Sequence, residues 1–382
     1  MIYVTIFMLM VLCILCDRRI RYERYYTIYF TCVMILLAGF KYRVGTDALL
    51  YEDLFNIYPD FDKITASYII ESRWAPLFIY IFSFFHTFFH DFIFFQFFHA
   101  AVLLFSLNLI LNYYLKKPIW GVTLFFVSYY LYLTFDLYRE GLAVAFFFIG
   151  YYFYASKRNY ILFFFFCFLA YNTHISSLFC FFLPLIENVK LNRRNFYYPI
   201  IIALLLSFIF TSYPKLLNLV LPSSQISDLA THYLSRTQGR GISISRIIYV
   251  CLLTYFLIYR NLDNNIVKEK KLIPLTYLYI IIATLDNSIP FIFRLNNYFF
   301  IFALIATCNL IERDYYKKSN RNIIKTLFVI LLFSSQRLSD EILNEVTYNA
   351  YNPYVTVFNP YKVSEREFHT KYAYLFYDQR NY

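Results

Sequence analysis

The sequence predicts an all-α polytopic membrane protein with about 11–14 transmembrane helices. Of its 382 residues, 60% are hydrophobic and only 15% are charged, which is more apolar surface than one soluble core can bury. The apolar runs are separated by short polar gaps, and two kinds of gap alternate along the chain. Strict alternation of this sort is expected of a chain that crosses a bilayer repeatedly.

Gaps of the first kind are dense in lysine and arginine and are predicted to face the cytoplasm. They lie at 116–117, 157–158, 190–194, 260–271 and 313–321. The excess behind the formal charge of +11 is concentrated in them, so topology explains it and no nucleic-acid partner is expected. Gaps of the second kind carry one or two ionisable groups among uncharged residues and are predicted to lie on the outer face; they are 136–140, 172–174, about 213–245, and 294–297.

The elements are expected in the following order. The first apolar run has no basic segment before it and no small-residue cleavage site, so it is predicted to be an uncleaved helix with its N-terminus outside. The loop at 41–73 is then outside, while the basic gap at 116–117 is inside, so the chain must cross the membrane an odd number of times between them. One full span is therefore expected near 92–114, preceded by a re-entrant or interfacial helix at about 74–90. The other predicted spans are 1–16, 25–40, 119–135, 141–156, 160–172, 175–187, 196–213, 246–259, 273–290, 296–312 and 322–334.

This order defines a transmembrane domain at 1–334, with outer loops at about 41–73 and 213–245. A polar, tyrosine-rich tail follows at 335–382, and if 322–334 spans, the tail lies outside and can fold over the other outer loops. The seven cysteines fall within or beside apolar runs, so neither a disulfide framework nor a metal site is predicted. The pair Asp60 and Asp62 has the spacing of a metal-binding motif, but no further ligand is linked to it in sequence.

Residues 39–47 of the first outer loop read Gly-Phe-Lys-Tyr-Arg-Val-Gly-Thr-Asp, and Tyr51 follows. Arg43 and Asp47 therefore flank a turn at the membrane surface, where a lipid-anchored diphosphate would lie. A second interpretation stays open, in which Arg43 extends to the headgroups and Asp47 caps a helix.

The second outer gap places Arg139 and Glu140 between two long apolar runs. A charge close to hydrocarbon costs on the order of 3 kcal/mol, so charges at a short hairpin tip favour a functional role over a decorative one. Arg139 suits a phosphate because its planar guanidinium donates two hydrogen bonds and stays charged.

The third gap contains His174, which titrates near neutrality and can accept a proton from a hydroxyl group. The alternative is a buried histidine with a packing role. In the long outer loop, Arg236 and Arg240 alternate with glycines and can surround an anion or a glycan, although a mobile polar connector is the commoner fate of such a loop. Arg294 adds another outer-face guanidinium.

Four segments together resemble the EpsG family, which is similar to the Wzy-like polymerases of O-antigen, capsule and exopolysaccharide. They are 40–47 with Tyr51, 138–143, 169–177, and the terminal segment that ends at Tyr354. The family usually has Arg-Gln in the second motif, so Glu140 departs from the pattern and its role stays open. The resemblance implies a GT-C-like glycosyltransferase architecture in a bacterial plasma (inner) membrane, with a site that faces the periplasm or exterior.

The resemblance also implies the chemistry. An acceptor sugar hydroxyl of one undecaprenyl-diphosphate-linked oligosaccharide attacks the anomeric carbon of another chain, and undecaprenyl diphosphate leaves. Membrane lipids, and a flippase and chain-length regulator of the same pathway, are the other expected partners; no cofactor is expected. The candidate residues are Arg43, Arg139 and Arg294 as phosphate contacts, Asp47 or His174 as base or orienting group, and Tyr51, Glu140, Arg236, Arg240 and Tyr354 as substrate contacts.

Two other functions remain open at this point. A lipid-linked oligosaccharide flippase would need charges at mid-depth of a central cavity, whereas the charges here cluster at the ends of spans. A membrane O-acyltransferase would also use a histidine and arginines, and only its acyl donor would separate it from a polymerase.

Overall fold

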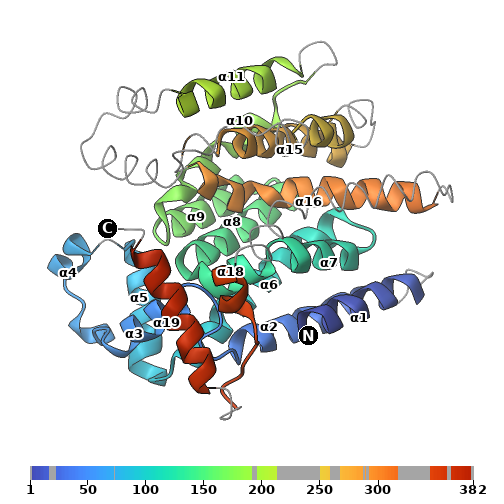
Figure 1. The fold of residues 1–382 in the computed structure, drawn as a ribbon. Coiled ribbons are helices and arrows are strands. Elements are labelled where there is room, and N and C mark those ends of the chain that lie inside the picture. Colours follow the sequence, from blue (N-terminus) through green and yellow to red (C-terminus); the bar gives the residue numbers. More distant parts are fainter. Residues whose placement is uncertain are drawn as a thin grey trace. The chain divides into compact units, whose positions relative to one another are not determined.

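The prediction of an all-α fold is confirmed by the computed structural model, in which helices are the regular elements of the described chain (Figure 1). The structure describes residues 2–16, 23–72, 74–191, 196–212, 250–258, 267–286, 289, 292–316, 345–358 and 363–379. Within these ranges, extended pairing is limited to an isolated antiparallel bridge between Lys41 and Thr356.

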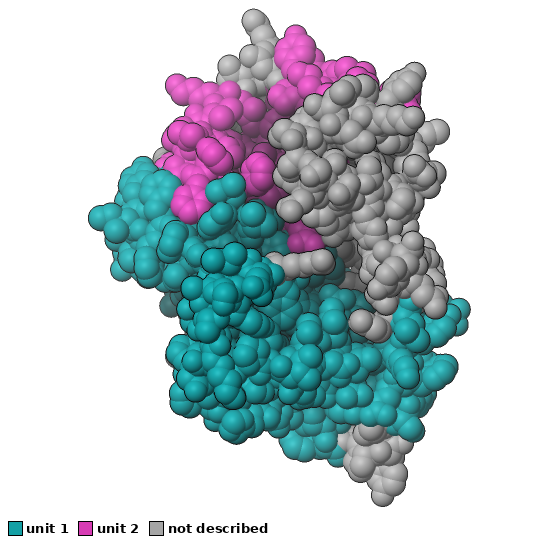
Figure 2. Space-filling view, turned by 90° about the vertical axis from the view of Figure 1, so that its left-hand side faces the viewer, with its two compact units in different colours: residues 1–178, 334–380, 382 teal, residues 179–333, 381 magenta. Residues whose placement is uncertain are grey.

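The chain forms two compact units, which Figure 2 colours separately. Unit 1 comprises Met1–Leu178 and Ser334–Arg380 with Tyr382, and unit 2 comprises Phe179–Phe333 with Asn381. Ser334–Arg380, called the C-terminal segment below, therefore belongs to the same unit as the loop at about 41–73, which the sequence predicts to be the first outer loop and which keeps that name here.

The helices of unit 1 follow the apolar runs and the loops between them. They are α1 (Ile2–Cys16), α2 (Glu23–Gly39), α3 (Ala48–Asn56), η2 (Phe61–Lys63), α4 (Ala66–Glu71), α5 (Pro76–Phe89), α6 (Phe92–Tyr114), α7 (Pro118–Ser128), η3 (Tyr132–Asp136), α8 (Tyr138–Lys157), α9 (Tyr160–Tyr171), α18 (Glu345–Tyr351) and α19 (Val363–Gln379). Helix α19 packs against α18 and α3 (Figure 1).

Local sequence explains several helix boundaries in unit 1. Pro76 begins α5, where its missing N–H is not needed. His90 takes a left-handed conformation (φ 53°), and Asp91 then caps α6 by accepting a hydrogen bond from the Ile93 amide at 2.9 Å. At the turn between α8 and α9, Asn159 caps the second helix in the same way.

An aromatic core lies beneath the first outer loop. The ring centroids of Phe82 and Phe95 are 4.9 Å apart, and those of Phe95 and Tyr138 are 5.6 Å apart. Trp74 packs on the same cluster, with its ring centroid 5.2 Å from that of Phe78. Rings with few rotatable bonds make a stiff support for the loop residues above them.

Unit 2 contains the remaining described helices. They are the second half of η4 (Ile175–Phe182), α10 (Leu183–Glu187), α11 (Tyr198–Ser212), η5 (Thr254–Ile258), α15 (Val267–Leu285) and α16 (Phe293–Tyr316). Lys271 of α15 pairs with the buried Glu187 of α10 at 3.2 Å, and Asn296 donates a hydrogen bond to Asp286 at 2.7 Å.

Two described helices are long and apolar enough to cross a membrane, namely Phe92–Tyr114 and Phe293–Glu312. Eight other described helices are apolar but have 10–17 residues, so length and composition alone do not make them spans. The predicted run at 119–135 is interrupted: α7 ends at Ser128 and the wide turn η3 carries the chain to Asp136. The predicted span 322–334 lies outside the described residues, as do residues 246–249 and 259 of the predicted span 246–259.

Candidate functional site

The first outer loop is held in place by the C-terminal segment. Three backbone hydrogen bonds join them, from Tyr42 N to Val355 O (3.0 Å), from Val357 N to Phe40 O (3.0 Å) and from Gly45 N to Ala350 O (2.9 Å). Tyr354, a predicted substrate contact, instead donates its hydroxyl to Leu37 O at 2.8 Å and fastens the segment to the end of α2. The tail thus folds over this outer loop.

Gly45 is required where the loop turns towards Asp136. Its φ is +126°, and a Cβ atom there would lie 2.5 Å from Asp136 Oδ1. That same carboxylate oxygen accepts a hydrogen bond from the Thr46 amide at 2.7 Å, while Oδ2 accepts one from the Tyr351 hydroxyl. Asp136 is therefore the buried anchor that joins the first and second motifs to the C-terminal segment.

Lys41 lies beside this anchor and is also buried. Its Nζ donates hydrogen bonds to Val44 O (3.1 Å) and Phe135 O (2.7 Å) and stands 4.3 Å from the Phe135 ring centroid. Burial lowers the pKa of Lys41 to about 7, although the charge of Asp136 opposes the shift. Burial raises the pKa of Asp136, against the hydrogen bond from Tyr351 and the charge of Lys41.

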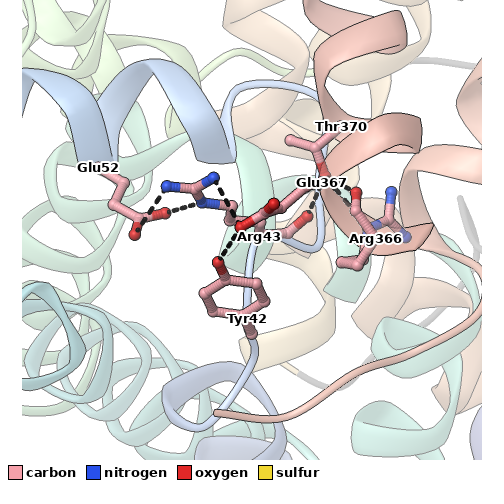
Figure 3. Close-up of polar contacts among 6 residues, drawn as sticks. All are labelled: Tyr42, Arg43, Glu52, Arg366, Glu367 and Thr370. Carbon is pink, nitrogen blue, oxygen red and sulfur yellow. Dashed lines mark hydrogen bonds and ion pairs between the residues drawn. The ribbon is translucent and has the colours of Figure 1, made fainter. Parts of the chain in front are cut away.

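Arg43 is enclosed between two carboxylates, as Figure 3 shows. Its Nε lies 2.7 Å from Glu52 Oε2, and its Nη1 lies 3.4 Å from Glu367 Oε1. Burial would lower the pKa of Arg43, but the hydrogen bond and charge of Glu52 outweigh it and the pKa is raised. The hydroxyl of Tyr42 donates to the same Glu367 oxygen at 2.7 Å, and burial together with this bond raises the pKa of Tyr42 to about 12.

Helix α19 is fixed over this cluster by Arg366 and Thr370 (Figure 3). Thr370 donates its hydroxyl to the carbonyl of Arg43 at 2.6 Å. Arg366 is fully buried and donates to Asn349 O at 2.7 Å and to Pro353 O at 3.3 Å. Burial lowers the pKa of Arg366 to about 10, which leaves it charged at neutral pH.

Arg139 has a different setting. Its Nε donates a hydrogen bond to the Tyr51 hydroxyl at 3.1 Å, and its guanidinium carbon lies 5.2 Å from the Trp74 ring centroid. The rings of Tyr51 and Trp74 are stacked with centroids 6.1 Å apart. Within the described parts of the chain, no ion pair joins Arg139 to a carboxylate. Next to it, Glu140 is buried in the first turn of α8, where the helix dipole favours a negative charge.

The motif that contains His174 lies next to the beginning of α5. Leu77 donates its backbone amide to Asn172 O at 2.8 Å, three residues after Trp74. His174 is 7% exposed, and its Nδ1 lies 2.6 Å from Ser176 Oγ. The structure thereby connects the third motif to the segment that carries Trp74, whose ring contacts the guanidinium of Arg139.

The remaining predicted residues are distributed as follows. Asp47 occupies the N-cap position of α3 without a side-chain capping bond. Arg294 belongs to unit 2, with its guanidinium 5.8 Å from the Phe293 ring centroid. Arg236 and Arg240 lie outside the described residues. Asp60 pairs with Lys63 within the first outer loop, and His86 Nδ1 of α5 lies 3.3 Å from its other carboxylate oxygen.

Sequence reasoning missed five charged residues that build this region: Lys41, Glu52, Asp136, Arg366 and Glu367. Lys41 and Asp136 stand inside motifs that the sequence did single out, so a charge next to an apolar run was an available signal. Nothing local in the sequence links Glu367 to Arg43, because 324 positions separate them.

Comparison with known protein families gives a match over most of the chain. The family model described as EpsG family matches residues 24–356, most of the chain. No curated protein and no solved structure matches it. The matched range includes the first three motifs and Tyr354 and ends before α19.

Proposed function

This chain belongs to the EpsG family, which is linked to exopolysaccharide biosynthesis, and from this membership we propose that it is a polysaccharide polymerase. It joins undecaprenyl-diphosphate-linked oligosaccharide repeat units into O-antigen, capsule or exopolysaccharide. The reaction takes place on the outer face of a bacterial plasma membrane, and the apolar helices, including those too short to qualify by length, cross or enter the bilayer by tilting and local thinning.

The observation that carries the proposal is the setting of Arg139. A guanidinium with a tyrosine hydroxyl on one edge and an indole beside it keeps donor groups available for an anion. In the transferase reaction, negative charge develops on the bridging oxygen of the departing diphosphate, and a fixed guanidinium stabilises it. We therefore assign the contact with the leaving group to Arg139.

The reaction exchanges one bond for another. The hydroxyl oxygen of the acceptor sugar forms a bond to the anomeric carbon of the donor chain, and the bond from that carbon to the diphosphate oxygen breaks. The hydroxyl proton passes to a base, for which His174 and Asp47 are the candidates, and undecaprenyl diphosphate departs with the electron pair. The hydrogen bond between His174 Nδ1 and the Ser176 hydroxyl fixes the orientation of the imidazole ring for such a role.

The test is reconstitution with the protein's own substrate. Deletion of the gene should cause single lipid-linked repeat units to accumulate, and these can be extracted and mixed with the purified full-length protein. Products of several repeat units, formed with or without a chelator, are the expected result.

A deletion strain with a normal ladder of polysaccharide chain lengths would reject the proposal. Accumulation of the units on the cytoplasmic side, with no elongation by the purified protein, would favour a flippase. Transfer of an acetyl group from acetyl-coenzyme A to the glycan, without elongation, would favour an acyltransferase.

A further inference from the structure

A pocket of about 330 Å³ lies where the first outer loop meets the N-terminus of α6. Its polar lining includes Arg43, Glu52, Asp91 and Gln96, and its apolar lining includes Phe92 and Ile93. The volume is at the lower end of the range for small-molecule sites. Nothing in the proposed chemistry at Arg139 uses these groups.

Gln96 points to a ligand in this pocket. The residue is only 7% exposed, and its amide atoms open onto the pocket and make no hydrogen bond to any other described residue. Buried amides are almost always hydrogen-bonded, so the partner of this one must enter the pocket, as water or as a ligand that replaces the water. A bound molecule with hydroxyl groups would supply the missing donor and acceptor.

The charges around the pocket disfavour an anion. Arg43 is already bound by Glu52 and Glu367, and the amino group of Lys41 is turned to two backbone carbonyls. Asp91 uses one oxygen to cap α6 and adds a further negative charge. A phosphate would meet two carboxylates of the lining and no uncompensated cation.

The same lining suits an uncharged sugar ring. Hydroxyl groups donate to the carboxylates of Glu52 and Asp91 and exchange hydrogen bonds with the amide of Gln96. Phe92 and Ile93 offer an apolar surface to the C–H face of the ring. We propose that this pocket binds a neutral, hydroxyl-bearing sugar of the repeat unit, an inference that rests on the proposed polymerase function for the origin of that sugar.

Helix α3 connects this pocket to the contact proposed for the diphosphate. Its adjacent residues Tyr51 and Glu52 hold Arg139 and Arg43, respectively. One short helix therefore positions both groups, so that the glycan and the diphosphate of one lipid-linked unit can be bound by neighbouring residues. The two subsites differ in the class of ligand that each recognises.

Two probes separate the subsites in binding experiments with the full-length protein in nanodiscs. The first is the free oligosaccharide released by mild acid from the lipid-linked units of the deletion strain, and the second is farnesyl diphosphate. Gln96→Leu should weaken oligosaccharide binding roughly five- to tenfold, as expected for a lost buried hydrogen bond, and leave farnesyl diphosphate binding unchanged. Arg139→Gln should do the reverse. Asn112→Leu, an exposed amide on the same helix, is the matched control and should change neither.

The retained binding of farnesyl diphosphate shows that Gln96→Leu is folded. The pocket assignment is overturned if the wild type does not bind the oligosaccharide, if Gln96→Leu binds it normally, or if that variant loses farnesyl diphosphate instead. If the wild type elongates the glycan and Gln96→Leu does so with a normal KM, the sugar-pocket assignment is wrong and the polymerase proposal stands. If oligosaccharide binding depends on Gln96 but the protein does not elongate the glycan, the pocket assignment stands and the polymerase proposal is wrong.

Discussion

Arg43 and Arg139 come from motifs that look alike in sequence and that are both predicted to lie on the outer face, yet their electrostatic settings are opposite. Arg43 is bound by the carboxylates of Glu52 and Glu367, whereas Arg139 has the Tyr51 hydroxyl and the Trp74 ring as partners. A neutral partner orients a guanidinium without cancelling its charge, while two carboxylates cancel it. An arginine at the membrane surface is therefore a candidate anion site only when its partners leave the charge uncompensated.

The two settings also differ in what removal of the arginine would disturb. Arg43 is part of a network that reaches Tyr42 and α19, so its loss leaves two carboxylates facing each other. Among the described residues, Arg139 makes one hydrogen bond and one cation–π contact, the latter worth about 0.5–2 kcal/mol. Variants at Arg139 should thus report on chemistry with little effect on folding.

The largest effect is expected for Arg139→Gln. Loss of a fixed donor to the departing diphosphate should lower the rate of elongation by about 10²–10³-fold. Arg139→Lys keeps the charge but loses the planar pair of donors and should recover part of the rate. The measurement is the initial rate with extracted lipid-linked units, next to the thermal stability of each variant. A rate for Arg139→Gln within threefold of the wild type would place the leaving group elsewhere.

Gly45→Ala should disturb the loop that carries Arg43 and leave the partners of Arg139 in place. A Cβ at this position would lie 2.5 Å from Asp136 Oδ1 on a backbone with φ of +126°, which L side chains rarely adopt. The expected loss is about 1–3 kcal/mol of folding free energy. A fall of several degrees in apparent melting temperature would support this reading, and an unchanged melting temperature would mean that the loop relaxes freely.

The sequence located the loops better than it located their partners. Charges beside apolar runs marked residues 39–47, where the structure has a loop, and 136–140, where η3 ends and α8 begins; the helices at 92–114 and 160–171 fall where hydrophobic runs predicted them. Such features are local, since they depend on residues within one or two helical turns. The interruption after Ser128 was not predicted, because a wide helical turn keeps the same apolar composition as the helix that it breaks.

The long-range contacts could not be predicted from the sequence. Glu367 lies in a polar helix whose residues resemble any solvated surface helix, and only the folded chain brings it to Arg43. The burial of Lys41 against two carbonyls also depends on a segment 94 positions away. The charge state of a candidate site residue is decided by such partners, which is why similar motifs around Arg43 and Arg139 ended in different settings.

Lys41, which lies beside Arg43 in the first outer loop, should make the stability of the folded protein depend on pH. Its pKa is about 7 in the folded protein and 10.5 in the unfolded chain, so between these values the unfolded state binds the extra proton. Stability should therefore rise with pH from about 7 to 10, by a few degrees in apparent melting temperature. Lys41→Met should lose this slope, and Asp136→Asn should keep it because burial still acts on the amine. A slope that persists in Lys41→Met would assign it to other groups.

Glu367→Gln is expected to have the smallest effect and makes the most direct test of the comparison. The Glu367 side chain is 44% exposed and lies 3.4 Å from Arg43, so the ion pair contributes less than about 1 kcal/mol to stability. Removing its charge, however, leaves Arg43 with Glu52 as its remaining ion-pair partner among the described residues, and its setting then approaches that of Arg139. Farnesyl diphosphate should bind up to a few times more tightly to Glu367→Gln, and more tightly again to Glu52→Gln, because Glu52 makes the shorter bond at 2.7 Å. If neither variant gains affinity, charge compensation is not what separates the two arginines, and the partners of Arg139 must act through geometry alone.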